Sequence, residues 1–422
     1  MYRVIAALLA VASCASIAQA QSTAPPSSVT PPFTLERALQ NAGATSPNLD
    51  AATAGVNAAS AARTVAGLRP NPEVQVQVEN VGGTGPYRGT QSAETTTGVA
   101  LPIELGGKRS ARIAVANSQS KRAALEAAII GADLSQSVTE AYISAVAAER
   151  RVEIARQLSE FANSGFRAAS ARVTAGAGSP IEQQRAEVAR ANAAVALETA
   201  VRDADVAREN LARLIGQPVA GPLDAFWFER VGTYGPAESI SAAGTLTVAA
   251  AETDLTTADA RVRLARSQRI PDLTLTAAAR RLSQTGDTAA VFGVNIPFPL
   301  FNSGRAGVAL AQAERSQADA RRRVAIIETE QAIALARTDL ANAASRARTA
   351  GGPALAAASE AARIAQIGYG QGKFSQLELL EAQRTLADTR QGFIDALVAF
   401  HQAEARLARL ITPAPGTGAT AQ

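Results

Sequence analysis

Short stretches in both halves of the chain alternate between apolar and polar residues, which is the period of a β-strand. Residues 73–79 read Glu-Val-Gln-Val-Gln-Val-Glu, so the three valines lie on one face and the polar groups on the other. The same alternation occurs at 95–105 and, in the second half, around Leu273 and Val294. The pattern therefore predicts four strands, at about 72–80, 95–105, 271–281 and 290–300.

The segments outside these strands are rich in alanine and have the spacing of long helices. One predicted helix covers 46–68 and is ended by the prolines that follow. Another covers 108–172, which contains no proline and little glycine. Its apolar positions are spaced three and four apart, as in a coiled-coil seam: Ile130, Leu134, Val138, Ala141 and Ala145. A counterpart begins at Arg305, and we expect a break or kink in it at Gly-Gly-Pro, 351–353.

The chain contains two diverged copies of one unit. The sequence Leu-Ala-Arg-Leu-Ile at 211–215 recurs unchanged at 407–411, 196 positions later. Each unit reads helix, strand, strand, helix. We therefore expect a mainly α fold with a minor β part, built from two tandem repeats. Repeat 1 covers 21–240 and includes an equatorial linker, repeat 2 covers 241–412, and a disordered tail covers 413–422.

Four strands with one apolar and one polar face pose a physical problem. The smallest closed barrels use about eight strands, and an open sheet leaves unpaired edges. Several chains must therefore contribute to one barrel, and three chains would supply 12 strands, an even antiparallel number. The long helices are too polar for lipid, so we expect them to project into water.

Composition and charge exclude several other classes of protein. The 422 residues include one Cys, one His and one Met, which argues against a disulfide framework, a zinc cluster or a nucleophile–His triad. We expect no enzyme, no cofactor and no metal site. The net charge is +4, and the two signs are interleaved, so a nucleic-acid partner is not expected.

The N-terminus predicts export from the cytoplasm. A short basic start, an apolar run and the small-x-small sequence Ala-Gln-Ala at 18–20 indicate a secretory signal peptide at 1–20. Residues 11–14 also resemble a lipoprotein cleavage signal, which would leave Cys14 acylated. In the alternative, Cys14 is an ordinary small residue of a removed peptide.

Each copy contains one turn between its long helical segments, and the two turns match. Ser179 and Ser375, each followed three residues later by a Glu, both read as helix-capping boxes. Glycines precede both of them, so the chain is expected to turn sharply and start a returning helix. The residues assigned to these turns are Gly176, Gly178, Ser179, Gly372, Lys373 and Ser375.

The exported, duplicated unit and two sequence motifs together resemble the TolC-like outer membrane efflux proteins. The motifs are Pro-Phe-Pro-Leu-Phe-Asn-Ser-Gly-Arg at 297–305 and Tyr-Gly-Gln-Gly at 369–372. Within that family, the segments 71–73, 78–80 and 102–109 resemble the CzcC-type branch, which serves heavy-metal resistance pumps. The first two read Asn-Pro-Glu and Val-Glu-Asn, and the third reads Pro-Ile-Glu-Leu-Gly-Gly-Lys-Arg.

The resemblance implies a homotrimer in outer-membrane lipid, with a 12-stranded barrel continued by long periplasmic coiled-coil helices. It also implies two partners, a periplasmic adaptor (membrane fusion protein) and an inner-membrane RND-type transporter. The expected function is the exit duct of a tripartite pump for divalent heavy-metal cations. A multidrug or type I secretion channel of the same architecture is one alternative. A periplasmic coiled-coil adaptor or scaffold without a pore is another.

The resemblance also places acidic pore residues six and nine positions after the second turn glycine, at Glu378 and Glu381. Glu378 has two interpretations, as the third residue of a capping box or as part of a ring of carboxylates in the pore. Glu381 has no capping use. Its first-copy counterpart is Arg185, and our hypothesis is that the two pair to hold the tip shut.

Overall fold

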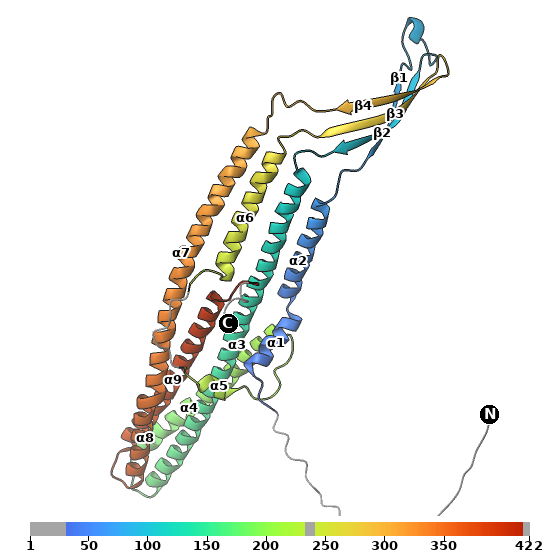
Figure 1. Ribbon diagram of the computed structural model, residues 1–422. Coiled ribbons are helices and arrows are strands. Elements are labelled where there is room, and N and C mark those ends of the chain that lie inside the picture. The colour runs from blue at the N-terminus through green and yellow to red at the C-terminus, as the bar shows by residue number, and fades with distance from the viewer. Residues whose placement is uncertain (1–30, 233–240, 417–422) are drawn as a thin grey trace, which may run out of the picture.

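The structure is a computed structural model that describes residues 31–232 and 241–416. Figure 1 shows a long rod of helices with a small, slanted sheet at one end and tight helical turns at the other. Among the described residues, no helix combines the length and the apolar character that crossing a membrane requires. The predicted signal peptide and Cys14 lie outside the described residues, as does most of the predicted tail.

The first copy runs from the middle of the rod to the sheet, returns along the whole length of the rod in one helix, and ends in a helix that leads back to the middle (Figure 1). Its α-helices and strands are α1 (Leu35–Thr45), α2 (Pro47–Ala66), β1 (Glu73–Glu79), β2 (Glu94–Ile103), α3 (Lys108–Thr174) and α4 (Pro180–Ile215). A 3-10 turn, η1 (Gly85–Tyr87), lies between the strands, and a short helix, α5 (Ala225–Glu229), lies in the linker after α4. The 67 residues of α3 make it ~100 Å long.

The second copy repeats this order. It contains α6 (Leu246–Ser267), β3 (Leu273–Leu282), β4 (Thr288–Asn295), α7 (Arg305–Thr349), α8 (Leu355–Gly370) and α9 (Gln376–Leu410). The mainly α fold class and the tandem repeat are therefore confirmed, and the four predicted strands are present with ends shifted by a few residues.

At 351–353, where a break or kink was expected, the chain stays helical but its α-helical hydrogen-bond pattern is interrupted. The segment η2 (Ala350–Ala354) is a single π-helical turn that separates the α-helices α7 and α8. A wider turn accommodates Pro353, which has no N–H to donate. Gly351 is needed here because a Cβ at this position would lie 2.3 Å from the ring of Phe393.

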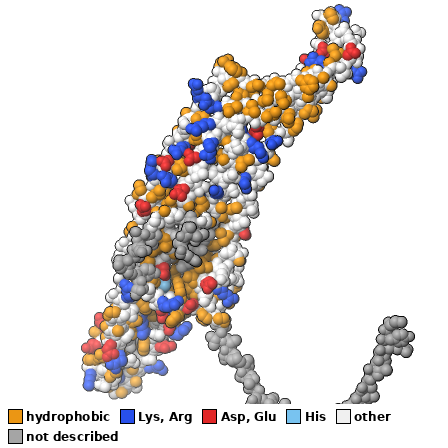
Figure 2. All heavy atoms as spheres, in the orientation of Figure 1, with side chains coloured by type: hydrophobic (Ala, Val, Ile, Leu, Met, Phe, Trp, Pro, Cys, Tyr) orange, Lys and Arg blue, Asp and Glu red, His pale blue; other side chains and the backbone are white. Residues whose placement is uncertain are grey.

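The four strands form one antiparallel sheet in the order β1-β2-β3-β4, so β1 and β4 are open edges. Direct pairing places most of the large apolar side chains on one face and most of the charged and amide side chains on the other, although Arg281 lies on the apolar face and Val291 on the polar face. The apolar face contains Val74, Val76, Val78, Val99, Leu101, Ile103, Leu273, Leu275, Phe292 and Val294. The opposite face contains Glu73, Gln75, Gln77, Glu79, Glu94, Thr96, Thr274, Thr276, Arg280 and Asn295. Figure 2 shows hydrophobic side chains gathered over the strands, with charged groups beyond both of their ends.

The buried core lies at the middle of the rod. Tyr142 of α3 is fully buried, and its hydroxyl donates to the carbonyl of Phe33 at 2.7 Å and accepts from the N–H of Asp224 at 2.9 Å. Burial raises the pKa of Tyr142 to about 12. Phe228 of α5 and Phe400 of α9 pack in the same cluster. Of the aromatic residues 226–228, Trp227 and Phe228 pack against the helices, whereas Phe226 is exposed.

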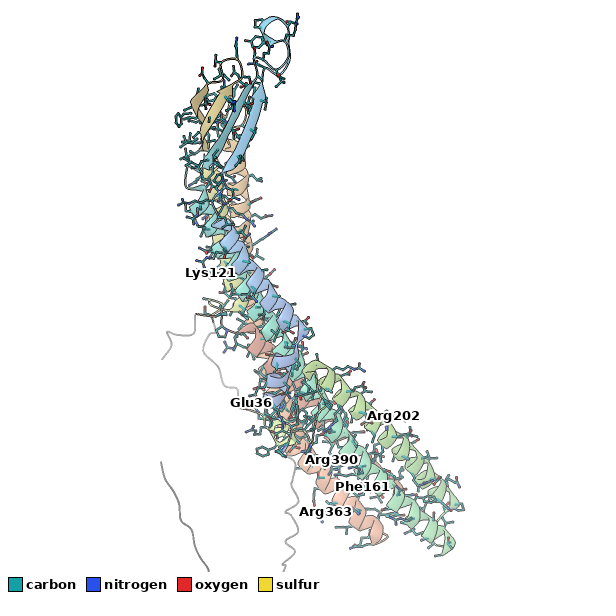
Figure 3. The ribbon with its side chains drawn as sticks, turned by 90° about the vertical axis from the view of Figure 1, so that its right-hand side faces the viewer. Glu36, Lys121, Phe161, Arg202, Arg363 and Arg390 are labelled. Carbon is teal, nitrogen blue, oxygen red and sulfur yellow. The ribbon has the colours of Figure 1, made fainter. Side chains whose placement is uncertain are left out.

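Below this core the helices separate into two pairs, α3 with α4 and α8 with α9, as the side view in Figure 3 shows. A groove between the pairs is lined in part by Phe161 of α3, Arg363 of α8 and Arg390 of α9. The side chain of Arg390 crosses it and donates to Gln157 Oε1 of α3 at 2.5 Å.

The start of the predicted disordered tail is ordered. Pro413 forms an isolated bridge with Thr245, and the N–H of Ala414 donates to the carbonyl of Gly244 at 2.8 Å. Ala414 is buried against Leu246 and Leu125. Residues 417–422 lie outside the described part of the chain.

Candidate functional site: the helical turns and the strand–helix junction

The two turns at the end of the rod have the same backbone. Gly176 and Gly372 each have φ near +71°, the left-handed conformation that favours glycine. In the first turn the N–H of Ala177 donates to Arg172 O and that of Gly176 to Val173 O; in the second, Lys373 N–H donates to Gly368 O and Gly372 N–H to Tyr369 O. These are two Schellman motifs, which satisfy the last carbonyls of each helix.

The second turn forms the predicted capping box. Ser375 Oγ accepts from the N–H of Glu378 at 3.3 Å, and the Glu378 carboxylate accepts from the N–H of Ser375 at 2.7 Å and from its hydroxyl at 2.8 Å. These hydrogen bonds, that from the Ser375 backbone first, lower the pKa of Glu378. The capping interpretation of Glu378 is confirmed, and its pore role stays a prediction.

The capping box predicted at the first turn is wrong. Ser179 makes no side-chain cap bond at the start of α4, where Pro180 occupies the first helical position. The carboxylate of Glu182 instead lies against the turn, with Oε2 3.3 Å from the position of a Cβ added to Gly178. That oxygen is buried and has no hydrogen-bond partner among the described residues. The space left by Gly178 lets the side chain turn away from the cap.

The two turns also divide their side-chain volume in opposite ways. In the first turn, Arg172 faces Gly178, where an added Cβ would lie 3.1 Å from Arg172 Cβ. The equivalent positions in the second turn are Gly368 and Phe374, where a Cβ on Gly368 would lie 2.1 Å from the Phe374 ring. Each turn thus combines one large side chain with one glycine, and the two have exchanged places.

The structure does not join Arg185 to Glu381 within one chain. Arg185 lies on α4 and Glu381 on α9, and each of these helices packs against α3. Both side chains are exposed, and among the described residues neither forms an ion pair. Lys373 is exposed at the second turn as well. Their roles in a pore remain predictions.

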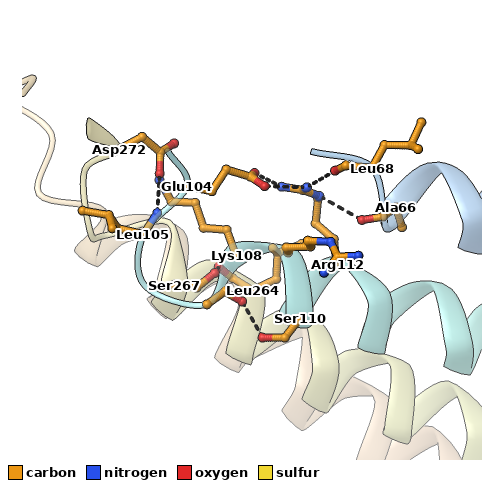
Figure 4. A network of polar contacts seen from close by, with 12 residues as sticks. Ala66, Leu68, Glu104, Leu105, Lys108, Ser110, Arg112, Leu264, Ser267 and Asp272 are labelled. Atoms are coloured by element: carbon orange, nitrogen blue, oxygen red, sulfur yellow. Dashed lines mark hydrogen bonds and ion pairs between the residues drawn. The ribbon is translucent and has the colours of Figure 1, made fainter. Parts of the chain in front are cut away.

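A polar network at the opposite end of the helices was missed from the sequence (Figure 4). Arg112 of α3 binds both oxygens of Glu104, and its NH2 group also donates to the carbonyl of Leu68 at 3.2 Å. The hydrogen bond from Arg112 lowers the pKa of Glu104. Lys108 pairs with Asp272 at 2.7 Å, and Asp272 also accepts from the N–H of Leu105 at 3.0 Å.

This network connects the end of α2, the β2–α3 connection and the α6–β3 connection, so it fixes the sheet on the helices. Gly106 completes it because a Cβ there would lie 2.8 Å from the Ile270 side chain. From the sequence, the segment 102–109 is informative only as a family motif. The charged residues Glu104 and Lys108 beside two glycines were the available signal, but the partners Leu68 and Asp272 are distant in sequence.

The comparisons with known proteins agree with this architecture. The family model described as outer membrane efflux protein matches residues 38–217 and 240–412. The chain belongs to the outer membrane efflux protein family. Members of this family are transport proteins, so the non-enzymatic assignment and the outer-membrane assignment hold at family level.

Individual relatives of this efflux protein carry metal-resistance names. It is 33% identical over 394 residues to the cobalt-zinc-cadmium resistance protein CzcC of Cupriavidus metallidurans, covering 90% of each chain. It is 31% identical over 305 residues to the nickel-cobalt-cadmium resistance protein NccC of Alcaligenes xylosoxydans xylosoxydans, covering 68% of each. The fold matches the outer membrane protein VceC of Vibrio cholerae with a TM-score of 0.74 at 19% identity, over 90% of this chain and 96% of that one.

The only histidine of this efflux protein has a packing role. His401 Nε2 lies 2.9 Å from the carbonyl of Phe228, and its ring stacks on Trp227 with centroids 4.4 Å apart. Within 31–232 and 241–416, no three His, Cys, Asp or Glu residues are placed to hold a metal ion.

Proposed function

We propose that three copies of this chain form an outer-membrane channel, the exit duct of a tripartite efflux pump. The observation that carries the proposal is the sheet, which has one apolar face, one polar face and two open edges. Pairing β4 of one copy with β1 of the next satisfies both edges. Three copies then close a barrel of about 12 strands, with the apolar face toward lipid and the polar face toward the lumen.

The helices would then extend into the periplasm, away from the sheet, and carry the two turns to the far end of the rod (Figure 1). There the turns would meet a periplasmic adaptor and, through it, an RND-type transporter of the inner membrane. Support for these partners comes from membership in the efflux family and from the tight, capped turns, which present a firm surface for contact.

Divalent heavy-metal cations are the proposed cargo. Support comes from the names of two relatives, which together cite cobalt, zinc, cadmium and nickel resistance. Deletion of the gene should increase sensitivity to these four metals, and the wild-type gene should restore tolerance. Unchanged metal tolerance, with loss of tolerance to organic toxic compounds instead, would overturn the metal cargo in favour of a multidrug channel.

The pore constriction is proposed at Glu378, Glu381 and Arg185, close behind the turns. Because Arg185 and Glu381 do not pair within one chain, their ion pair would join neighbouring copies. Glu381→Gln or Arg185→Gln should then increase single-channel conductance in planar bilayers. Glu360→Gln is a matched control, since Glu360 is an exposed carboxylate on α8 that already pairs with Arg363 at 2.7 Å. Equal conductance in all three variants and the wild type would refute the constriction.

A further inference from the structure

A second charged cluster lies at the outer end of the strands, on the polar face. Glu79 of β1 and Glu94 of β2 are directly opposite each other in the antiparallel register. Two like charges in this arrangement repel each other and destabilise the strand pair. The sheet therefore requires a compensating cation at this point.

Arg280 of β3 supplies that cation. Its guanidinium lies 3.0 Å from Glu94 and 3.2 Å from Glu79, and its Nε donates to Thr96 Oγ1 at 3.0 Å. Asn80 supports the cluster from the end of β1, where its side-chain amide donates to Glu94 at 3.4 Å. Asn80 has φ of +57°, an uncommon conformation that Asn tolerates better than most residues. Arg280 thus links the carboxylates of β1 and β2 in one cluster of ion pairs.

The polar face is the concave side of the sheet here. Gly98 and Ala278 are directly paired on this face, and a Cβ added to Gly98 would lie 2.4 Å from that of Ala278. Directly opposite Cβ atoms in an ordinary sheet are ~5 Å apart, so the sheet bends sharply toward this face. When such a sheet closes, its concave side becomes the inside of the barrel.

We propose that Glu79, Glu94 and Arg280, here called the mouth triad, form a charged ring that makes the outer mouth of the channel favour cations. This inference rests on the proposed trimeric channel. Two carboxylates against one guanidinium leave each triad with a net charge of −1, which three copies repeat around the lumen. Glu73, at the opposite end of β1, is another carboxylate on the same face. The ring matches a cationic cargo, because like charges lower and opposite charges raise the local concentration of an ion.

The triad makes opposite predictions for its own members. Arg280→Gln leaves two carboxylates unopposed in each copy and should increase the K⁺ over Cl⁻ permeability ratio. Glu79→Gln combined with Glu94→Gln reverses the sign of the ring and should decrease it. In water, one charge ~8 Å away changes the local concentration of a monovalent ion about twofold, so each shift should be about twofold or more.

Arg281→Gln is the matched control. Arg281 is the next residue in β3, pairs directly with Thr95 and lies on the apolar face, so the same loss of charge occurs outside the lumen. Reversal potentials are measured in a KCl gradient with full-length trimers, whose assembly is first checked on detergent gels. Opposite shifts for the two triad variants, with none for Arg281→Gln, support the inference. A wild type that conducts while all variants keep its permeability ratio overturns the mouth triad alone, and a wild type without channels overturns the proposed function.

Discussion

The two turns at the end of the rod have one backbone and two different sets of side chains. Both are Schellman motifs around a glycine with φ near +71°. The second turn is closed by a capping box, whereas in the first Ser179 makes no cap bond and a buried oxygen of Glu182 has no hydrogen-bond partner in the described part of the chain. The duplicated unit has therefore retained its hydrogen-bonded chain reversal, while the side chains that brace it have changed.

The exchanged volumes teach the same lesson in packing terms. Arg172 faces Gly178 in the first turn, and Gly368 faces Phe374 in the second. A turn this tight has room for one large side chain only, and either of the two positions can provide it. The difference between the turns can be tested position by position, because each residue has a counterpart in the other copy.

The largest effect is expected for Gly368→Ala. The added methyl would lie 2.1 Å from the Phe374 ring, so the ring must leave its place, and overpacking of this kind costs ~1–3 kcal/mol. Hydrogen–deuterium exchange of the second-turn amides should become ~10-fold faster or more. Gly178→Ala, with a closest distance of 3.1 Å, should change the first turn less. Phe374→Ala added to Gly368→Ala should restore protection; failure to do so would refute the packing explanation.

The next effect should be equal in both turns. Gly176→Ala and Gly372→Ala each force a side chain into the left-handed conformation, at ~1–2 kcal/mol. Among the described residues, none beyond the immediate chain neighbours lies within 4 Å of a Cβ added at either position, so the cost is conformational and not steric. Exchange at the mutated turn should be accelerated to a similar degree in the two variants. A clear difference between them would show that the two backbones are not equivalent.

The sequence predicted those parts of the fold that depend on local pattern. Alternation in 73–79, the long helical segment from Lys108 and the 196-residue offset were enough for the strands, the helices and the duplication. The turn glycines and the Ser375 cap also follow from short-range rules. The strand count suggested three chains in one barrel, and the family resemblance supplied the pump partners.

The sequence predicted side-chain contacts less well where a side chain has more than one possible hydrogen-bond partner. Ser179 and Glu182 have the capping spacing, yet the room beside Gly178 gives the carboxylate another position. Proline usually ends a helix, but here one π-helical turn accommodates Pro353 and the chain stays helical. The bonds of Arg112 to Glu104 and Leu68, and of Arg280 to Glu79, depend on how separate segments are brought together, which no local pattern specifies.

A smaller effect separates the two serines. Ser375→Ala removes a formed cap and should cost ~1 kcal/mol, seen as faster exchange of the first amides of α9. Ser179→Ala removes a hydroxyl that makes no cap bond, so exchange at the start of α4 should stay as in the wild type. Equal acceleration in both variants would mean that Ser179 caps its helix in solution.

The smallest effect is a pH dependence confined to the second turn. The bonds from Ser375 lower the pKa of Glu378 below its ordinary value of 4.5, so the carboxylate binds protons less readily in the folded turn than in the open one. Its stabilising contribution is therefore complete above pH 4.5 and is lost as the pH falls through the lowered pKa. Protection factors of the second-turn amides should decrease there, while Glu378→Gln, which cannot titrate, should flatten the profile. If Glu378→Gln reproduces the wild-type profile, another group controls the turn.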